Sequence, residues 1–147
     1  MEIKTILCPV DGTELADKVL EAAAYLGKAL DARVVLLNIV EKWYRSAPFT
    51  TDSAEWETIH EGWLKEGRAI LETNAGKLKA MGVKHIETTL GDGEAAYEIV
   101  AIATQKNADL IVMATHRYSP MGKLFIGSVT SKVSKHTPCP IMWVFAG

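Results

Sequence analysis

Two short segments carry residue types suited to binding a phosphorylated ligand. Gly127-Ser128-Val129-Thr130 opens a predicted helix, and the N-terminus of a helix presents N–H groups and the positive end of the helix dipole. Gly127 lets a phosphate approach the backbone, and the hydroxyls of Ser128 and Thr130 add donors. Pro9-Val10-Asp11-Gly12 offers a carboxylate and backbone polar groups suited to an adenine or a ribose. Together they outline a mononucleotide site, and a polar connector that ends in a serine cap remains the alternative.

Two other glycine-containing segments are similar to nucleotide-binding fingerprints but differ in their surroundings. Gly91–Ala96 fits G-x-G-x-x-G/A between a predicted strand and a predicted helix. In a dinucleotide fold this pattern follows the first strand and an acidic residue ends the next one, whereas here it follows the third strand and Asp109 begins the next. We therefore predict a tight turn and a helix entry. Gly122-Lys123 does not complete a Walker loop, because Arg117 and Leu124 occupy its glycine and Ser/Thr positions.

The remaining reactive side chains form no recognisable catalytic or metal-binding set. The sequence has no G-x-S-x-G motif, and its histidines are scattered without an i, i+4 pair for a metal: His60, His85, His116 and His136. Of these, only His116 follows the carboxyl end of a predicted central strand. Cys8 and Cys139 are too few for a disulfide framework and lack the spacing of a zinc site, so both are predicted to be small buried hydrophobic residues.

Short apolar runs alternate along the chain with helical patterns. This alternation predicts an α/β fold with a parallel sheet, whose strands and helices position the two binding segments. The predicted strands are Ile3–Pro9, Arg33–Val40, His85–Leu90, Asp109–Ala114 and Ile141–Phe145. Nearly continuous apolar runs in the first, second and fourth indicate central strands covered by helices on both faces. The third is more polar, which favours a place near an edge. Open α/β sheets bind ligands beyond the carboxyl ends of their strands, where both binding segments would meet.

Helical spacing of apolar residues places a helix after each of the first four strands. The first begins after Asp11-Gly12-Thr13, where an Asp or Thr side chain can cap it. The others cover about Glu55–Ala80, Glu94–Gln105 and Ser128–His136. Three glycines weaken the second helix by about 1 kcal/mol each, and its Trp56 and Trp63 are predicted to be core residues. The aromatic segment Lys42–Ala54 has two open interpretations, a lid or a surface loop.

Composition narrows the range of partners. The chain has 147 residues, and we expect one domain over residues 1–147. Its 16 Lys and Arg against 18 Asp and Glu give a net charge of −2 without a block of either sign, so no nucleic-acid partner is expected. Its apolar stretches fall short of the ~18 residues that span a bilayer, and its amino end lacks a signal-peptide h-region. These features predict a cytoplasmic protein without a membrane partner.

Taken together, these segments resemble the universal stress protein family over nearly the whole length of the chain. The matching segments are KTILCPVDGTELADKVLEAA, VVLLNIVE, LGDGEAAYEIVAIA, ADLIVMATHR and IGSVTSKVSKHTPCPIMWV. The resemblance implies a single-domain, open five-stranded parallel sheet in the order 3-2-1-4-5 with helices on both faces. This is the Rossmann-like nucleotide-binding α-hydrolase type. It also implies a homodimer through the last strand, Ile141–Phe145, which would otherwise be an exposed apolar edge.

The resemblance further implies which residues form a nucleotide site. Pro9, Val10 and Asp11 would hold the adenine and ribose, and Ile39 would pack beside the base. The phosphates would be lined by Met113, Ala114, Arg117, Gly127, Ser128, Val129 and Thr130. Any Mg²⁺ would be held mostly by the nucleotide, because carboxylate ligands do not cluster here.

One loop separates this chain from the ATP-binding branch of the family, whose pattern is G-2x-G-9x-G-[S/T]. The spacing is kept here, but Ala114 and Arg117 replace the first two glycines. A left-handed backbone at Arg117 would cost about 1–2 kcal/mol. Its guanidinium, by contrast, suits a phosphate. Another branch lacks the glycine loop and is thought not to bind ATP.

Three functional hypotheses follow. The first is a stress-response protein that binds ATP or a related adenine nucleotide as a sensor or regulator, with slow hydrolysis at most. The second is a homodimeric interaction module without nucleotide, in which Arg117 and Trp43–Phe49 serve a protein partner or are surface residues. The third is phosphotransfer or ATP hydrolysis by His116 or Asp11, for which no base, nucleophile and orienting group are visible together.

Overall fold

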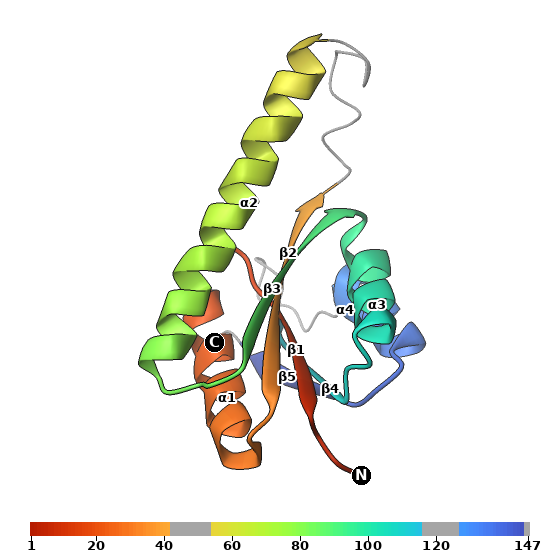
Figure 1. The fold of residues 1–147 in the computed structure, drawn as a ribbon. Coiled ribbons are helices and arrows are strands. Elements are labelled where there is room, and N and C mark those ends of the chain that lie inside the picture. The colour runs from red at the N-terminus through yellow and green to blue at the C-terminus, as the bar shows by residue number, and fades with distance from the viewer. Residues whose placement is uncertain (42–53, 116–126, 146–147) are drawn as a thin grey trace.

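The computed structural model describes residues 1–41, 54–115 and 127–145. Its strands are β1 (Thr5–Pro9), β2 (Arg33–Glu41), β3 (Ile86–Gly93), β4 (Leu110–Thr115) and β5 (Ile141–Phe145). All paired strands are parallel, and the order across the sheet is β3-β2-β1-β4-β5 (Figure 1). This confirms the predicted α/β class and strand order, including the place of the more polar β3 at an edge.

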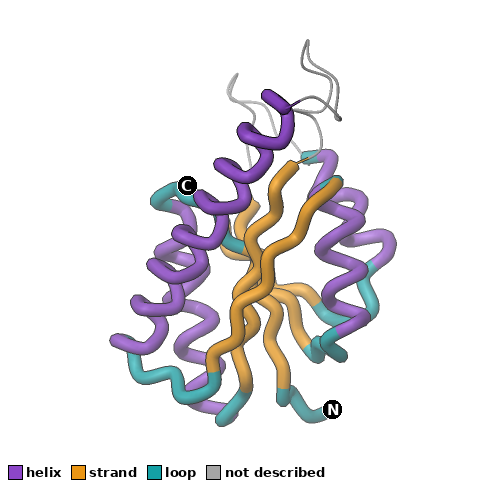
Figure 2. The backbone as a smooth tube through the Cα atoms, turned by 45° about the horizontal axis from the view of Figure 1, so that its top comes forward, coloured by secondary structure: helices purple, strands orange, loops and turns teal. Residues whose placement is uncertain are grey.

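Helices cover both faces of this sheet (Figure 2). They are α1 (Leu15–Leu30), α2 (Ala54–Ala80), α3 (Ala95–Gln105) and α4 (Ser128–His136). Successive residues of a strand point to opposite faces. Accordingly, Ile6 and Cys8 join the buried cluster under α1 and α2, whereas Leu7 joins the one under α3 and α4. The apolar runs in β1, β2 and β4 follow from this two-sided burial.

The start of β4 differs from the prediction that Asp109 begins the strand. Asp109 lies just before β4, and its Oδ2 accepts hydrogen bonds from the backbone N–H groups of Lys4 (2.9 Å) and Thr5 (3.0 Å). Its own N–H donates to the Thr5 carbonyl at 2.8 Å. Asp109 therefore fastens the beginning of β1, which starts at Thr5 and not at Ile3.

The predicted tight turn at Gly91-Asp92-Gly93 is wrong, because β3 continues through these residues. Gly91, Asp92 and Gly93 are paired with the last three residues of β2, which runs to Glu41. A Cβ atom at Gly91 would lie 3.3 Å from Ile39 Cγ1, so glycine suits this close approach. The prediction of a helix entry directly afterwards is confirmed, since α3 begins at Ala95.

The residues before α1 form a turn of their own and do not cap the helix. The N-cap residue is Glu14, without a side-chain capping hydrogen bond. Asp11 Oδ1 instead accepts hydrogen bonds from the backbone N–H (2.9 Å) and the hydroxyl of Thr13. The predicted cap by Asp11 or Thr13 is therefore wrong, because the Asp11 carboxylate is used two residues further on, before the helix begins.

The long helix α2 packs its glycines in two different ways. Cβ atoms built at Gly62 and Gly76 would meet nothing within 4 Å, so these positions face open space. A Cβ atom at Gly67 would lie 2.7 Å from Leu90 Cδ1 and 2.9 Å from Asn38 Oδ1. Of the three glycines of α2, Gly67 is therefore the one that lies closest to the sheet.

Near its beginning, α2 carries an aromatic group that packs over the ends of β2 and β3. Trp56 is buried, in line with its predicted core role, while Trp63 is partly buried. The Trp56 ring stacks on His60 with ring centroids 5.4 Å apart and meets Trp63 edge-on at 6.3 Å. His60 Nε2 lies 2.9 Å from Asp92 Oδ2, which links α2 to the end of β3.

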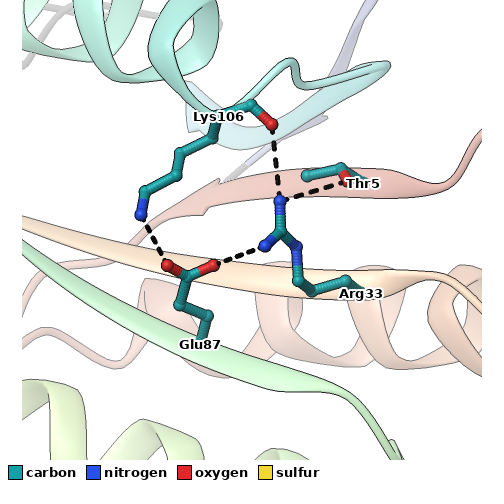
Figure 3. A network of polar contacts seen from close by, with 4 residues as sticks. All are labelled: Thr5, Arg33, Glu87 and Lys106. Carbon is teal, nitrogen blue, oxygen red and sulfur yellow. Dashed lines mark hydrogen bonds and ion pairs between the residues drawn. The ribbon is translucent and has the colours of Figure 1, made fainter.

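At the amino-terminal end of the sheet, four residues form the polar network drawn in Figure 3. Glu87 of β3 pairs with Arg33 of β2 (2.9 Å) and with Lys106 (2.5 Å), the residue that follows α3. Arg33 Nη2 donates to the Lys106 carbonyl (3.4 Å) and to Thr5 Oγ1 of β1 (3.5 Å). The network joins three strands and the end of α3 on the side of the sheet opposite the carboxyl ends of the strands.

Candidate functional site

The carboxyl ends of β1, β2 and β4 lie side by side in the centre of the sheet. The strand that follows β1 in the sequence, β2, pairs with one edge of β1, and β4 pairs with the other edge. This is the switch point of strand order, where open α/β sheets form a ligand crevice. Pro9 ends β1 and Thr115 ends the adjacent strand β4. The first predicted binding segment begins at Pro9, and the second, Gly127–Thr130, lies at the start of α4, the helix that follows β4.

The first turn of α4 presents backbone donors at this edge. Gly127 is the N-cap residue with φ −64° and ψ 156°, and no side-chain hydrogen bond caps the helix in the described part of the chain. The intrahelical ladder starts with the Ser131 N–H donating to the Gly127 carbonyl at 2.9 Å. The N–H groups of Ser128, Val129 and Thr130 therefore precede that ladder, and no acidic residue lies in the first turn. Such a terminus favours an anion.

A hydroxyl pair joins this helix to the sheet. Thr115 Oγ1 and Thr130 Oγ1 lie 3.0 Å apart, and Thr115 is buried at the end of β4. The contact holds the first turn of α4 against the carboxyl end of β4. Thr115 is absent from the residues predicted for the site, although a hydroxyl at the end of an apolar strand is a usable signal.

Three predicted site residues come together on one face of the sheet. Met113 is part of the buried cluster under α3 and α4, and Ile39 and Val129 pack against the same cluster. Val10 and Ala114 belong to the cluster on the opposite face. The predicted residues thus border the carboxyl edge of the sheet from both sides, with an apolar wall on the face of α3 and α4.

The segment after β1 is held by β2. Pro9 is partly buried, Val10 is buried and Asp11 is exposed. The Val10 N–H donates to the Leu37 carbonyl at 2.8 Å, and the Val10 carbonyl accepts a hydrogen bond from Asn38 Nδ2 at 2.9 Å. Asn38 is likewise absent from the predicted site residues, although its amide interrupts the apolar run from Val34 to Val40.

Several predictions fall on parts of the chain outside the described residues. Arg117 and His116 lie there, as do Gly122-Lys123 and residues 42–53 of the aromatic segment. The proposed roles of Arg117 and His116, and the choice between a lid and a surface loop, remain predictions.

Within the described residues, no group of three or more His, Cys, Asp or Glu side chains is arranged to hold a metal ion. Cys8 and Cys139 are not joined in a disulfide. Cys8 is buried, as predicted, and burial raises its thiol pKa to about 12. Cys139 is only partly buried, and burial raises its pKa as well. None of the described helices combines the length and apolar character needed to cross a membrane.

Comparison with known sequences gives consistent matches over nearly the whole chain. The family model for the universal stress protein family matches residues 2–144. Universal stress protein MJ0531 of Methanocaldococcus jannaschii is 34% identical over 143 residues, which cover 96% of this chain and 81% of that protein. Universal stress protein YxiE of Bacillus subtilis is 32% identical over 148 residues, covering 95% of this chain and 97% of that protein.

Solved structures share the fold at lower sequence identity. The hypothetical protein MJ0577 matches with a TM-score of 0.85 and 22% identity, covering 100% of this chain and 99% of the other. A universal stress protein in complex with cAMP has a TM-score of 0.73 at 20% identity and full coverage of both chains. The Archaeoglobus fulgidus protein in complex with dAMP has a TM-score of 0.63 at 20% identity, covering 97% and 98%. The fold, the family model and the sequence relatives agree, and the chain belongs to the universal stress protein family.

Proposed function

We propose that this protein binds ATP or a related adenine nucleotide at the carboxyl edge of the sheet and acts as a sensor or regulator in a stress response. The observation that carries the proposal is the first turn of α4. Its backbone donors lie ahead of the intrahelical ladder, no acidic side chain opposes an anion there, and Thr130 contacts Thr115 at the end of β4. Two structural neighbours, solved with cAMP and with dAMP, support an adenine nucleotide as the ligand class.

The proposed arrangement assigns the two ends of the nucleotide to different segments. Pro9, Val10 and Asp11 would contact the adenine and ribose, and Ile39 would pack beside the base, since it borders the apolar wall that also contains Met113. The phosphates would meet the residues after β4 and at the start of α4: Ala114, Arg117, Gly127, Ser128, Val129 and Thr130. Mg²⁺ would be held mostly by the phosphates, because the described residues offer no carboxylate cluster for it.

Ligand-dependent stabilisation tests this proposal. A ligand that binds only the native state stabilises it by RT ln(1 + [L]/Kd), which is about 2.7 kcal/mol at a hundredfold excess over Kd. We expect millimolar ATP with Mg²⁺ to raise the Tm of ligand-free protein and Gly127→Val to abolish that rise. The backbone at Gly127 is extended, a conformation that valine also adopts, and the valine side chain would hinder the approach of a phosphate to the backbone.

The matched control is Gly62→Val, which makes the same change on the open side of α2 and should keep the ATP-dependent rise in Tm. No rise in Tm with any adenine nucleotide would contradict the proposal and favour the interaction module without nucleotide.

We also propose a homodimer formed through β5. This strand lies at the edge of the sheet, and its Met142 and Phe145 side chains are 39% and 42% exposed. An apolar edge strand is prone to pair with another chain, and a second copy would cover it.

A further inference from the structure

Both backbone polar groups of Val10 are held by neighbouring residues of β2. The N–H donates to the Leu37 carbonyl at 2.8 Å, and the carbonyl accepts a hydrogen bond from Asn38 Nδ2 at 2.9 Å. Val10 is the first residue beyond β1, and its carbonyl belongs to the peptide unit that leads into Asp11. The Asn38 amide therefore sets the orientation of the peptide plane from which Asp11 projects.

Asn38 lies in a setting that would otherwise favour an apolar side chain. It is 7% exposed, and the residues on either side of it along the same face of β2, Leu36 and Val40, are buried and apolar. Burying an amide is unfavourable unless it forms hydrogen bonds. The bond to the Val10 carbonyl, which reaches across to the segment after β1, accounts for an amide at this position.

Gly67 of α2 provides the space for this amide. A Cβ atom at position 67 would lie 2.9 Å from Asn38 Oδ1, closer than ordinary contact. Asn38 Nδ2 is bonded to the Val10 carbonyl, so Oδ1 cannot move away from α2 without disturbing that bond. The packing of α2 is thus connected to the conformation of Val10 through one side chain.

We propose that Asn38 is a positioning residue for the nucleotide, which acts by holding the Val10 carbonyl and thereby orienting Asp11, and that Gly67 is required to accommodate it. This inference rests on the proposed function, since Asp11 is the residue expected to contact the adenine and ribose. Asn38 itself packs on the face of α2, away from the apolar wall of Ile39 and Met113, and supports the site without touching the ligand.

Two substitutions of Asn38 separate positioning from general destabilisation. Asn38→Leu removes the donor at every pH, so the Val10 carbonyl is no longer held before the ligand binds. A cost of about 1 kcal/mol for ordering it on binding corresponds to a Kd for ATP about fivefold higher. Asn38→Asp places a carboxylate against the Val10 carbonyl at pH 8, and binding should weaken at least as much. At pH 5.5 a larger fraction of this carboxyl group is protonated than at pH 8, and the protonated form can donate to that carbonyl.

Calorimetric titration with ATP and Mg²⁺ at both pH values measures these effects. We expect the ratio of the Asn38→Asp Kd to the wild-type Kd to fall toward one at pH 5.5, while the ratio for Asn38→Leu stays constant. Dividing by the wild-type value removes the titration of the nucleotide itself. Protonation would also restore the stability of the fold, so the titrations are made at a temperature where every variant is fully native, and a change in the ratio then reports the site.

A second measurement needs no nucleotide. The ¹⁵N resonance of the Asp11 amide reports the hydrogen bond to the Val10 carbonyl, and we expect it to move in Asn38→Leu and, at pH 8, in Asn38→Asp. Gly67→Ala, which presses on the amide from α2, should move the same resonance, whereas Gly62→Ala on the open face of α2 should not. These two variants keep the test available where an Asn38 variant fails to fold.

The outcomes distinguish the two proposals. Wild-type protein that binds no adenine nucleotide overturns the proposed function. If the wild-type protein binds the nucleotide and both Asn38 variants keep its Kd, only the positioning role of Asn38 is overturned. An Asp11 resonance that does not move in these variants has the same meaning.

Discussion

The thiol of Cys8 lies on the central strand β1, under α1 and α2, and is fully buried. Because the thiolate would lose its hydration there, burial raises the pKa from 9.0 to about 12. Only the thiolate is a strong nucleophile and metal ligand, so this cysteine serves as a packing residue in the native state.

The raised pKa has a consequence for stability at alkaline pH. Above pH 9 the unfolded chain loses the Cys8 proton while the native protein keeps it, so the unfolded state binds fewer protons. The free energy of unfolding should therefore fall between pH 9 and about 12, by up to about 1.4 kcal/mol per pH unit from this group.

Urea unfolding of wild-type protein and Cys8→Ala at a series of pH values measures that contribution. We expect the alanine variant to be less stable at pH 7, because it leaves a cavity, but to lose stability less steeply above pH 9. Parallel curves for the two proteins would show that Cys8 does not titrate as its burial indicates.

The three glycines of α2 differ in whether a side chain fits in their place. Alanine in an exposed helix interior is about 1 kcal/mol more favourable than glycine. Gly62→Ala and Gly76→Ala, where a Cβ atom meets nothing within 4 Å, should each raise the free energy of unfolding by up to this amount. Gly67→Ala should lower it by about 1–3 kcal/mol, because its Cβ atom would overlap Leu90 and Asn38.

Urea midpoints of the three single variants provide the comparison. The gains at Gly62 and Gly76 should add in the double variant, since the two positions are well separated on the helix and share no contacts. If Gly67→Ala proved as stable as Gly62→Ala, α2 would have room to move away from the sheet, and the close approach at Asn38 would not be required.

For the molecule as a whole, the two edges of the sheet differ in character. The edge strand β5 exposes Met142 and Phe145, whereas the other edge strand, β3, carries Thr88 as an exposed polar residue. We expect Met142→Lys to convert the proposed dimer into a monomer, because a charge cannot be buried unpaired in an apolar interface.

Light scattering coupled to size-exclusion chromatography gives the mass of each variant. Thr88→Lys, the same charge on the opposite edge, should leave the mass of the wild-type dimer unchanged. A monomeric wild-type protein, or a dimer that survives Met142→Lys, would place the contact elsewhere or exclude it.

Local patterns in the sequence were sufficient for the succession of strands and helices along the chain and for which strands are covered on both faces. Continuous apolar runs predicted β1, β2 and β4 as central strands, and the interval Ile141–Phe145 matches β5 at both ends. These predictions succeed because burial on one or both faces of an element imposes a period that nearby residues display directly. The binding of a nucleotide by the segments after β1 and at the start of α4 stays a prediction, although their places at the ends of elements match the structure.

Contacts in the folded protein determined where β3 ends and how the residues beside the proposed site are held, which the local sequence pattern did not predict. Gly91-Asp92-Gly93 resembles a turn, but the last three residues of β2 pair with it and extend β3 through it. The Asp11 carboxylate turns to Thr13, the Asn38 amide reaches the Val10 carbonyl, and Gly67 fits against that amide. The last two pairings join residues about 30 positions apart, and a hydrogen bond or a steric limit between such residues leaves no periodic trace along the chain. The apolar pattern therefore determined the scaffold, and tertiary packing determined how the residues beside the proposed site are held.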